Sequence, residues 1–303
     1  MHSSNGRKRK AMETKSGSSS MNKARNENMS VVKGKGLVDL VDDCSDRSCS
    51  CPVLLRLLIV GHNPSQVAWE KGHYYANPNN WMWRILIETG IADKRFVVSA
   101  NEDWLMPGKC GVGFTDVGSG VPGTKSGSFS SRYIRDSWRD PFFDRLRAIG
   151  DRAGAYWDCR CTNMCGSPAV IAFSGKRQFI ELFDTKGKKQ REKKQKIDQE
   201  PIKANKSSSS RDGSQDNEII KSEMCPVEIQ YGKQHVLPNG WPLPVASSEV
   251  WVLPSTSGAA AMTREDRFGP WQRLADRLRE IPFPRSVCCE GKNDHSASVN
   301  RNK

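Results

Sequence analysis

Residues 57–65 read LLIVGHNPS, an apolar, β-prone run that ends abruptly in a Gly-x-Asn-Pro turn. Glycine and proline stop the run because neither continues a regular buried strand. The turn places one polar amide, Asn63, just beyond the carboxyl end of the strand. Open α/β sheets bind their ligands at this end of their strands. The stretch therefore predicts an α/β sheet with a ligand site at its edge.

The rest of the chain continues the alternation of strands and helices. Apolar runs at 169–173 and 249–253 predict two more buried strands, each followed by helical sequence. The first of these helices is expected to run through Phe183, and the last to open at Pro270. This order predicts a three-layer α/β/α sandwich with a short, mostly parallel central sheet.

Three further helices are expected between the first two strands. One covers 81–89, one opens at Ser130 or Ser131, and one runs from Asp140 as N-cap to Gly150 as C-cap. The glycine-rich stretch 103–128 is expected to be an irregular loop. Residues 151–168 carry no pattern that assigns them.

Composition divides the chain into a folded domain and polar segments. Residues 1–50 are expected to form a disordered arm, and residues 284–303 a disordered tail. The folded domain is expected over 51–283, interrupted by a disordered insertion at about 184–225.

The net charge of +13 belongs to two of these segments. Residues 1–36 hold nine Lys/Arg against two Asp/Glu, residues 186–196 hold seven against one, and the remainder is neutral. Such arms bind DNA phosphates without sequence preference, and Arg7–Lys10 is typical of a nuclear-import signal. A solvated tail without a receptor is the alternative. We expect a nuclear protein.

No apolar run approaches the ~18 residues of a membrane span, and no membrane partner is expected. The ten cysteines are expected to be mostly reduced thiols, with no metal or cofactor. A structural zinc site is the alternative for two clusters without a paired C-x-x-C spacing. These clusters are Cys44, Cys49 and Cys51, and Cys159, Cys161 and Cys165.

Three loops, 61–80, 105–124 and 254–261, can share one cleft at the sheet edge. They contain no GxGxxG, Walker, HExxH or GxSxG motif, which leaves dinucleotide, nucleotide and common hydrolase chemistry without support. They offer a neutral amide, hydroxyls, glycine N–H groups and two tyrosines. This set suits a flat heterocycle held by stacking and edge hydrogen bonds.

Six motifs in these loops, taken in order, resemble those of the mismatch-specific uracil/thymine DNA glycosylases of the uracil-DNA glycosylase superfamily. The motifs are GHNP at 61–64, KGHYY at 71–75, PxNxxW at 78–83, LMPGK at 105–109, GVGFT at 111–115 and PSTS at 254–257. The resemblance spans about 54–280, apart from 151–168 and 184–245. It implies a monofunctional, cofactor-free hydrolase that removes uracil, or thymine, opposite guanine from double-stranded DNA in base excision repair. We expect it to act as a monomer.

The resemblance also implies roles for individual residues. Asn63 would orient the attacking water, because a carboxamide can accept a hydrogen bond but is too weak a base to take a proton. Base binding is implied for Pro64, His73, Tyr75, Asn80 and Asp116, and DNA contact for Pro254, Ser255, Thr256, Ser257, Gly258 and Ala259.

Purely structural roles stay open for several of these residues. Asn63 can hold its turn, Tyr75 can pack in the interior, Asn80 can cap a helix, and Asp116 can face solvent.

Among the positions that depart from the family pattern, which include Ser65 and Val121, two bear most on function. Asp116 stands where an Asn contacts the base, and an ionised Asp only accepts hydrogen bonds. Ala259 stands where family members insert an Arg or Leu into the gap left by the flipped base. A DNA-binding protein of the same fold with weakened catalysis is therefore the alternative function. A small-molecule hydrolase acting on free nucleosides is a third.

Overall fold

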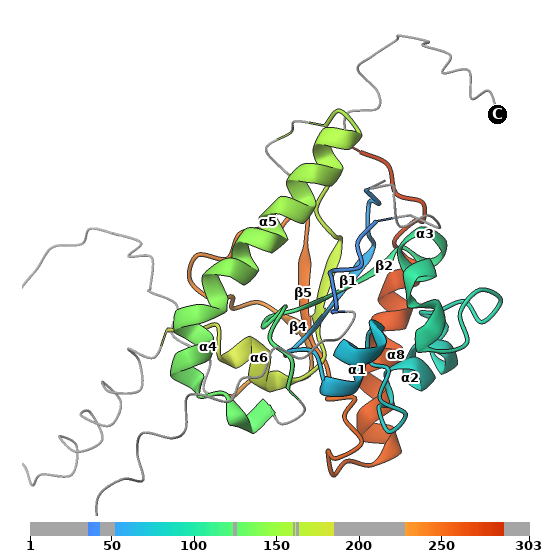
Figure 1. Cartoon of the computed structure of the whole chain (residues 1–303). Helices are drawn as coiled ribbons and strands as arrows, with labels where there is room; N and C mark the ends of the chain where they lie inside the picture. Colours follow the sequence, from blue (N-terminus) through green and yellow to red (C-terminus); the bar gives the residue numbers. More distant parts are fainter. Residues whose placement is uncertain are drawn as a thin grey trace, which may run out of the picture. The chain divides into compact units, whose positions relative to one another are not determined.

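A five-stranded sheet in the order β2-β1-β3-β5-β4 organises the chain. The structure is a computed structural model that describes residues 36–42, 52–123, 126–159, 161, 164–184 and 228–287. Neighbouring strands are parallel except β4, which runs antiparallel to β5 at the edge (Figure 1). The strands are β1 Leu57–Gly61, β2 Val112–Asp116, β3 Val170–Phe173, β4 Gly232–Gln234 and β5 Glu249–Val252.

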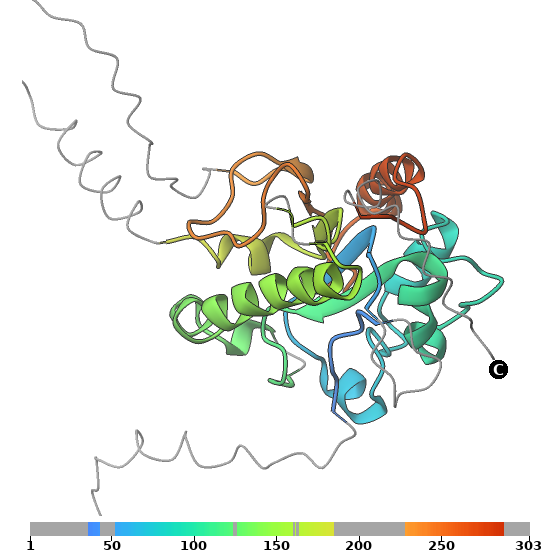
Figure 2. The ribbon, with the colours of Figure 1, turned by 90° about the horizontal axis from the view of Figure 1, so that it is seen from above.

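Helices cover both faces of this sheet (Figure 2). They are α1 Gln66–Lys71, α2 Met82–Glu88, α3 Met106–Cys110, α4 Ser131–Ser137, α5 Arg139–Tyr156, α6 Lys176–Ile180 and α8 Arg264–Arg279, with 3-10 turns η1 Ala100–Leu105 and η2 Ser126–Ser128. None of the described helices is long and apolar enough to cross a membrane.

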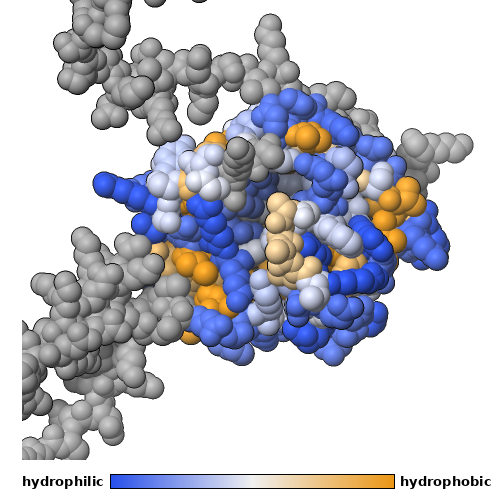
Figure 3. Space-filling view, turned by 90° about the horizontal axis from the view of Figure 1, so that it is seen from below, coloured by the Kyte–Doolittle hydropathy of each residue, from blue (hydrophilic) through white to orange (hydrophobic). Residues whose placement is uncertain are grey.

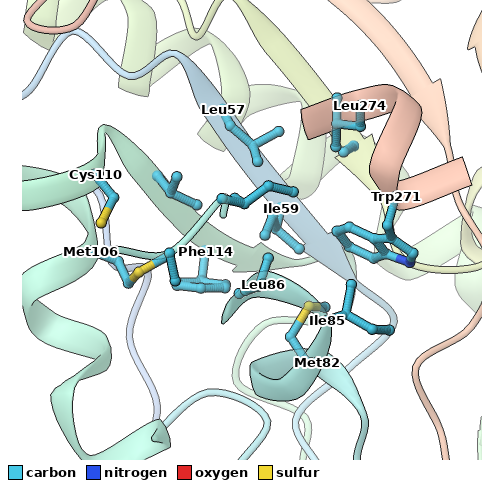
Figure 4. Packing of buried hydrophobic residues seen from close by; sticks show 14 of the residues in the cluster. Leu57, Ile59, Met82, Ile85, Leu86, Met106, Cys110, Phe114, Trp271 and Leu274 are labelled. Atoms are coloured by element: carbon cyan, nitrogen blue, oxygen red, sulfur yellow. The ribbon is translucent and has the colours of Figure 1, made fainter. Parts of the chain in front are cut away.

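Side-chain alternation along β1 explains the layers. Leu57 and Ile59 point into a cluster with α2, α3 and α8 (Figure 4), whereas Leu58 and Val60 point into a second cluster with α4, α5 and α6. All four side chains are fully buried, as expected for a parallel strand covered on both faces. The three-layer α/β/α sandwich with a mostly parallel sheet is thus confirmed.

The prediction of an irregular loop at 103–128 is wrong for its first half, which contains α3 and β2. Gly113 lies inside β2 because a second segment comes close: a Cβ there would lie 2.8 Å from the carbonyl oxygen of Leu40. Leu40 and Phe114 exchange two backbone hydrogen bonds of 2.9 Å. A glycine is needed at this position because two backbone segments come close together, and it does not indicate irregular structure.

Residues 36–42, within the range expected to be a disordered arm, therefore pack against β2, and Leu37 and Val41 are buried. At the other end, Val287 is buried although it falls in the expected tail. The chain before residue 36, the expected insertion from 185 to 225 and the tail beyond 287 lie outside the described residues.

Four predicted helix limits are wrong. Helix α5 begins at Arg139 with Trp138 as N-cap instead of Asp140, and α6 ends at Ile180 instead of Phe183. Helix α5 passes through Gly150 to Tyr156, and Gly150 is small because a Cβ would lie 2.7 Å from Ser167 Oγ. Helix α8 starts six residues before Pro270, since Thr263 caps it by accepting from the Asp266 N–H. The helices predicted over 81–89 and from Ser130 agree with α2 and α4.

Candidate active site

A cavity of about 320 Å³ opens at the carboxyl ends of the parallel strands. Its walls come from the segments that follow β1, β2, β3 and β5, so the three predicted loops do share one cleft. Viewed from below the molecule of Figure 1, this face is largely hydrophilic and hollowed near its centre (Figure 3). The volume lies at the lower end of small-ligand pockets, ~300–1,000 Å³.

Asn63 reaches this cavity with its carboxamide held in one orientation. Its Nδ2 donates to the carbonyl oxygens of Val121 and Gly123 at 3.0 and 3.1 Å, and lies 3.2 Å from that of Pro64. Three surrounding acceptors fix which end of the amide is nitrogen, because a flipped amide would set oxygen against oxygen. Asn63 therefore does hold its turn, and the same bonds fix the direction of its carbonyl.

His62 completes the amide environment. Its Nδ1 lies 2.7 Å from Asn63 Oδ1, so Nδ1 carries a proton and donates it to the amide oxygen. Burial lowers the pKa of His62, so the ring stays neutral at physiological pH. Oδ1 keeps one lone pair for a further donor such as a water molecule.

The loop after β2 is bound to the loop after β1 through the backbone. The N–H of Gly118 donates to His62 O at 2.8 Å, and that of Gly123 to Pro64 O at 2.8 Å. Gly118 is needed because a Cβ would lie 2.6 Å from the Trp138 ring. The two loops thus form one rigid unit around Asn63.

Tyr75 and Asp116 line the inner part of the cavity beside Gly61. A Cβ on Gly61 would lie 2.0 Å from Asp116 Oδ1 and 2.9 Å from the Tyr75 hydroxyl, so both groups approach the strand end where no side chain stands. Tyr75 packs edge-on against Phe114, and its hydroxyl lies 3.1 Å from Ser174 Oγ. Its positive φ of 53° turns the chain at this point.

Asp116 is buried, and the solvent-facing alternative is wrong. Burial raises the pKa of Asp116 to about 7, helped by the negative charge of Asp39 and opposed by Arg145. Asp39 comes from the 36–42 segment and accepts from Thr115 Oγ1 at 2.8 Å. Near neutral pH, Asp116 can therefore carry a proton and donate it in a hydrogen bond.

Two further predicted base-binding residues have structural bonds. His73 does not line the cavity that the described residues enclose: its Nδ1 lies 2.9 Å from Asp103 Oδ1, and Asp103 also accepts from the Tyr74 N–H. Asn80 lines the cavity but caps α2, with Oδ1 accepting from the Met82 N–H at 2.9 Å. His73 thus anchors the loop that carries Tyr75.

Arg267 organises the 254–260 loop. Its guanidinium is 4% exposed and donates to the carbonyl oxygens of Ser255, Ser257 and Ala260 at 2.8–3.0 Å. Pro254 O accepts from Trp271 Nε1, Thr256 O accepts from the Trp81 N–H, and Gly258 lies against the Asn79 backbone. Ala259 is exposed. The loop is built before any ligand arrives.

We expect Arg267→Met to lower the free energy of unfolding by ~2–4 kcal/mol, because it leaves three carbonyl groups without their donor. Urea denaturation measures this change. The exposed Arg273 of the same helix is the matched control, and Arg273→Met should stay within ~0.5 kcal/mol. Equal loss in the two variants would contradict the role given to Arg267.

The sequence did not indicate the cavity residues that follow β3. Ser174, Lys176 and Arg177 line the cavity, as does Leu37 from the 36–42 segment. The Ser-Gly pair directly after the apolar run at 169–173 was the available signal, since it marks a strand end at the same sheet edge. No local sequence pattern predicted that Leu37 would line the cavity.

A polar cavity at the carboxyl edge of a doubly covered parallel sheet defines an α/β domain of the ligand-binding or enzymatic kind. A family model described as "Uracil DNA glycosylase superfamily" matches residues 50–279. The chain therefore belongs to the uracil-DNA glycosylase superfamily. This is a superfamily of DNA glycosylases, hydrolases that act on DNA in base excision repair.

Proposed function

We propose that the protein is a monofunctional, mismatch-specific glycosylase that hydrolyses the bond between deoxyribose and uracil paired with guanine, with thymine as a slower substrate. It acts as a monomer on double-stranded DNA in the nucleus and leaves an abasic site. The observation that carries this proposal is the Asn63 carboxamide, locked by three backbone carbonyls with one carbonyl lone pair left over at a cavity of base size.

The chemistry of the bond explains why such an amide suffices. Glycosidic cleavage passes through an oxocarbenium-like state in which the base departs as an anion. Uracil and thymine are stable as anions once they have left the sugar, so the enzyme needs a positioned water more than a strong base. The remaining lone pair on Asn63 Oδ1 accepts one water hydrogen and directs the water oxygen toward the sugar.

Tyr75 and Asp116 hold the flipped base in this proposal. The aromatic ring of Tyr75 offers a stacking surface, and it is kept in place by Phe114 and Ser174. Asp116 in its protonated form donates to a carbonyl oxygen of the pyrimidine, which also stabilises the departing anion.

The DNA backbone meets the rim of the cavity. Ser255, Thr256 and Ser257 line the cavity, and so do Lys176 and Arg177. Hydroxyls, N–H groups and cations of this kind bind phosphates. The basic segments at 1–36 and 186–196 add non-specific attraction to DNA.

A base-release assay tests the proposal. Duplexes that differ in one pair, G·U, G·T, A·U or G·C, are incubated with excess protein and the abasic sites are cut with alkali. We expect cleavage of G·U first, G·T more slowly and A·U least, since wobble pairs cost less to open. No cleavage of G·U at any protein concentration, or release of base from free nucleosides instead, would overturn it.

The exposed Ala259 favours a second candidate, a DNA-binding protein whose catalysis is weak because no large side chain fills the gap in the duplex. Ala259→Arg distinguishes the two. We expect this variant to release uracil from G·U about tenfold faster, because an inserted side chain holds the base extruded. Single-turnover rates measure the change, with Ala261→Arg as control at another exposed alanine of the loop. If neither protein releases uracil while both still bind the duplex, the DNA-binding function is supported instead.

A further inference from the structure

Three cysteines meet at the end of the sheet opposite the cavity. Cys159, Cys161 and Cys165 lie in the connection from α5 to β3, which enters the sheet where Val170 pairs with Leu57, the first residue of β1 (Figure 1). Their sulfur atoms all lie within 4.8 Å of one another. This group is separate from every residue of the proposed catalytic site.

The three sulfur atoms lie close enough together to bind one metal ion. Four ligands around zinc at Zn–S ~2.3 Å lie about 3.8 Å from one another in a tetrahedron, and these three sulfur atoms lie within 4.8 Å of one another. Cys159 Sγ and Cys165 Sγ are 2.6 Å apart, so binding of zinc would move them further apart. A disulfide would use only two of the sulfur atoms, whereas a metal ion uses all three.

The backbone around the thiols is strained in a way that brings them together. Asp158 and Met164, at the two ends of the group, adopt left-handed conformations with φ of 50° and 47°. Each costs ~1 kcal/mol or more for a residue with a side chain and persists only where the surroundings enforce it. Between and after them, the N–H of Met164 donates to Cys161 O and that of Ser167 to Met164 O, which closes two turns.

The connection is also seated firmly on α5. Gly166 packs so closely that a Cβ would lie 2.3 Å from Gly150 O and from the Gly154 nitrogen. The N–H of Cys159 donates to Gly154 O at 2.8 Å. Loop and helix together form a preorganised support for the three sulfur atoms.

Apolar side chains and one cation surround the three sulfur atoms. Leu54 and Val287 pack around Cys159. The guanidinium of Arg285 donates to the carbonyl oxygens of Cys165, Ser167 and Leu55, which places a half-buried positive charge beside the group. A cation here offsets the negative charge that three thiolates bring to a divalent ion.

We propose that Cys159, Cys161 and Cys165 bind one zinc ion as thiolates. The ion crosslinks residues 159–165 of the α5–β3 connection, and its role is structural. Zinc takes four ligands, so one position is completed by water or by one more side chain. Borderline-soft zinc fits a sulfur-rich group better than magnesium or calcium, which take oxygen ligands.

The experiment measures metal in the full-length protein, purified without chelators and dialysed. We expect about one zinc per chain by elemental analysis, with full release when a mercurial reagent titrates the thiols. Cys161→Ser and the double variant Cys159→Ser/Cys165→Ser should lose it, whereas Cys110→Ser, at the buried last residue of α3, should retain it. Replacement by cobalt should give the absorption bands of a tetrahedral site with three or four thiolates.

Chelation should lower the melting temperature but leave uracil release at low temperature unchanged. The reason is that the cavity lies at the carboxyl ends of the strands, whereas the cysteines lie at the opposite end of the sheet. The wild-type measurements do not depend on whether the variants fold. Less than ~0.2 zinc per chain in the wild type, a Cys159–Cys165 disulfide in the zinc-supplemented protein, or full zinc content in the cysteine variants would each overturn the proposal. None of these outcomes depends on whether the glycosylase proposal is right.

Discussion

Asn63→Ala is expected to lower the single-turnover rate of uracil release from a G·U duplex by at least ~100-fold. The alanine removes the only side-chain acceptor that the proposal assigns to the attacking water, and loss of one preorganised polar group at a reacting centre commonly costs ~10²–10³ in rate. Stopped-flow mixing of excess protein with labelled duplex, followed by alkaline cleavage of abasic sites, measures it.

Two controls separate lost chemistry from a damaged loop, since Asn63 Nδ2 also binds Val121 O and Gly123 O. Affinity for a duplex that already carries an abasic site should fall less than ~5-fold, because phosphate contacts do not involve the amide. Asn101→Ala, at an exposed asparagine of η1, should leave the rate unchanged. An Asn63→Ala protein that keeps more than a tenth of the wild-type rate would refute the water-positioning role.

The rate of uracil release should fall as pH rises through about 7, the value to which burial and Asp39 raise the pKa of Asp116. Below that pH the neutral carboxyl donates to the base, whereas above it a carboxylate faces the departing anion and repels it. We expect a drop of ~10-fold or more between pH 6 and pH 8.5. Asp116→Asn keeps a donor at every pH, so its profile should be flat over this range.

Other groups near Asp116 do not produce the same profile. Burial lowers the pKa of His62, and it raises the pKa values of Tyr74 and Tyr75 further above this range. The pKa of Asp39 is raised too. Because the negative charge of Asp39 helps to raise the pKa of Asp116, Asp39→Asn should shift the transition to lower pH. A wild-type profile without a transition, or one that persists in Asp116→Asn, would contradict this assignment.

The same carboxyl links stability to pH. The folded chain holds the Asp116 proton up to about pH 7, whereas an unfolded Asp loses it near its ordinary value of 3.8. Stability contributed by this group is therefore present below pH ~4 and is lost as pH rises to about 7, by up to ~4 kcal/mol. Asp116→Asn should remove that loss, which urea denaturation at pH 5 and pH 8 can measure.

Much of the sheet could be predicted because β1, β3 and β5 are short apolar runs ended by polar turns. These patterns report burial on both faces and need no knowledge of distant contacts. The Asn63 turn follows from the first of them. Membership of the superfamily confirms the broad part of the functional prediction, while the mismatch-specific part stays a proposal.

The errors share a different cause. Gly113, Gly150 and Pro270 were interpreted as local breaks, but each stands inside a regular element. The two glycines allow a second segment to come close, and Pro270 is buried in a helix already capped at Thr263. A glycine or a proline indicates a steric requirement of the backbone, but it does not show whether the segment that imposes this requirement is near or distant in sequence. Tertiary contacts therefore decide whether the residue breaks a helix or strand or lies inside one.

The β-bridge between Leu40 and Phe114 has a consequence for how activity can vary among related chains. Leu37 lines the cavity and Asp39 helps to raise the pKa of Asp116, yet both lie before residue 50, where the match to the superfamily begins. Residues that shape the cavity and its charge thus lie in a part of the sequence that the family match does not cover. Two enzymes with identical catalytic motifs can then differ in pH optimum. A protein shortened to residues 50–279 would lack Asp39, so the pKa of Asp116 would differ from that in the full chain.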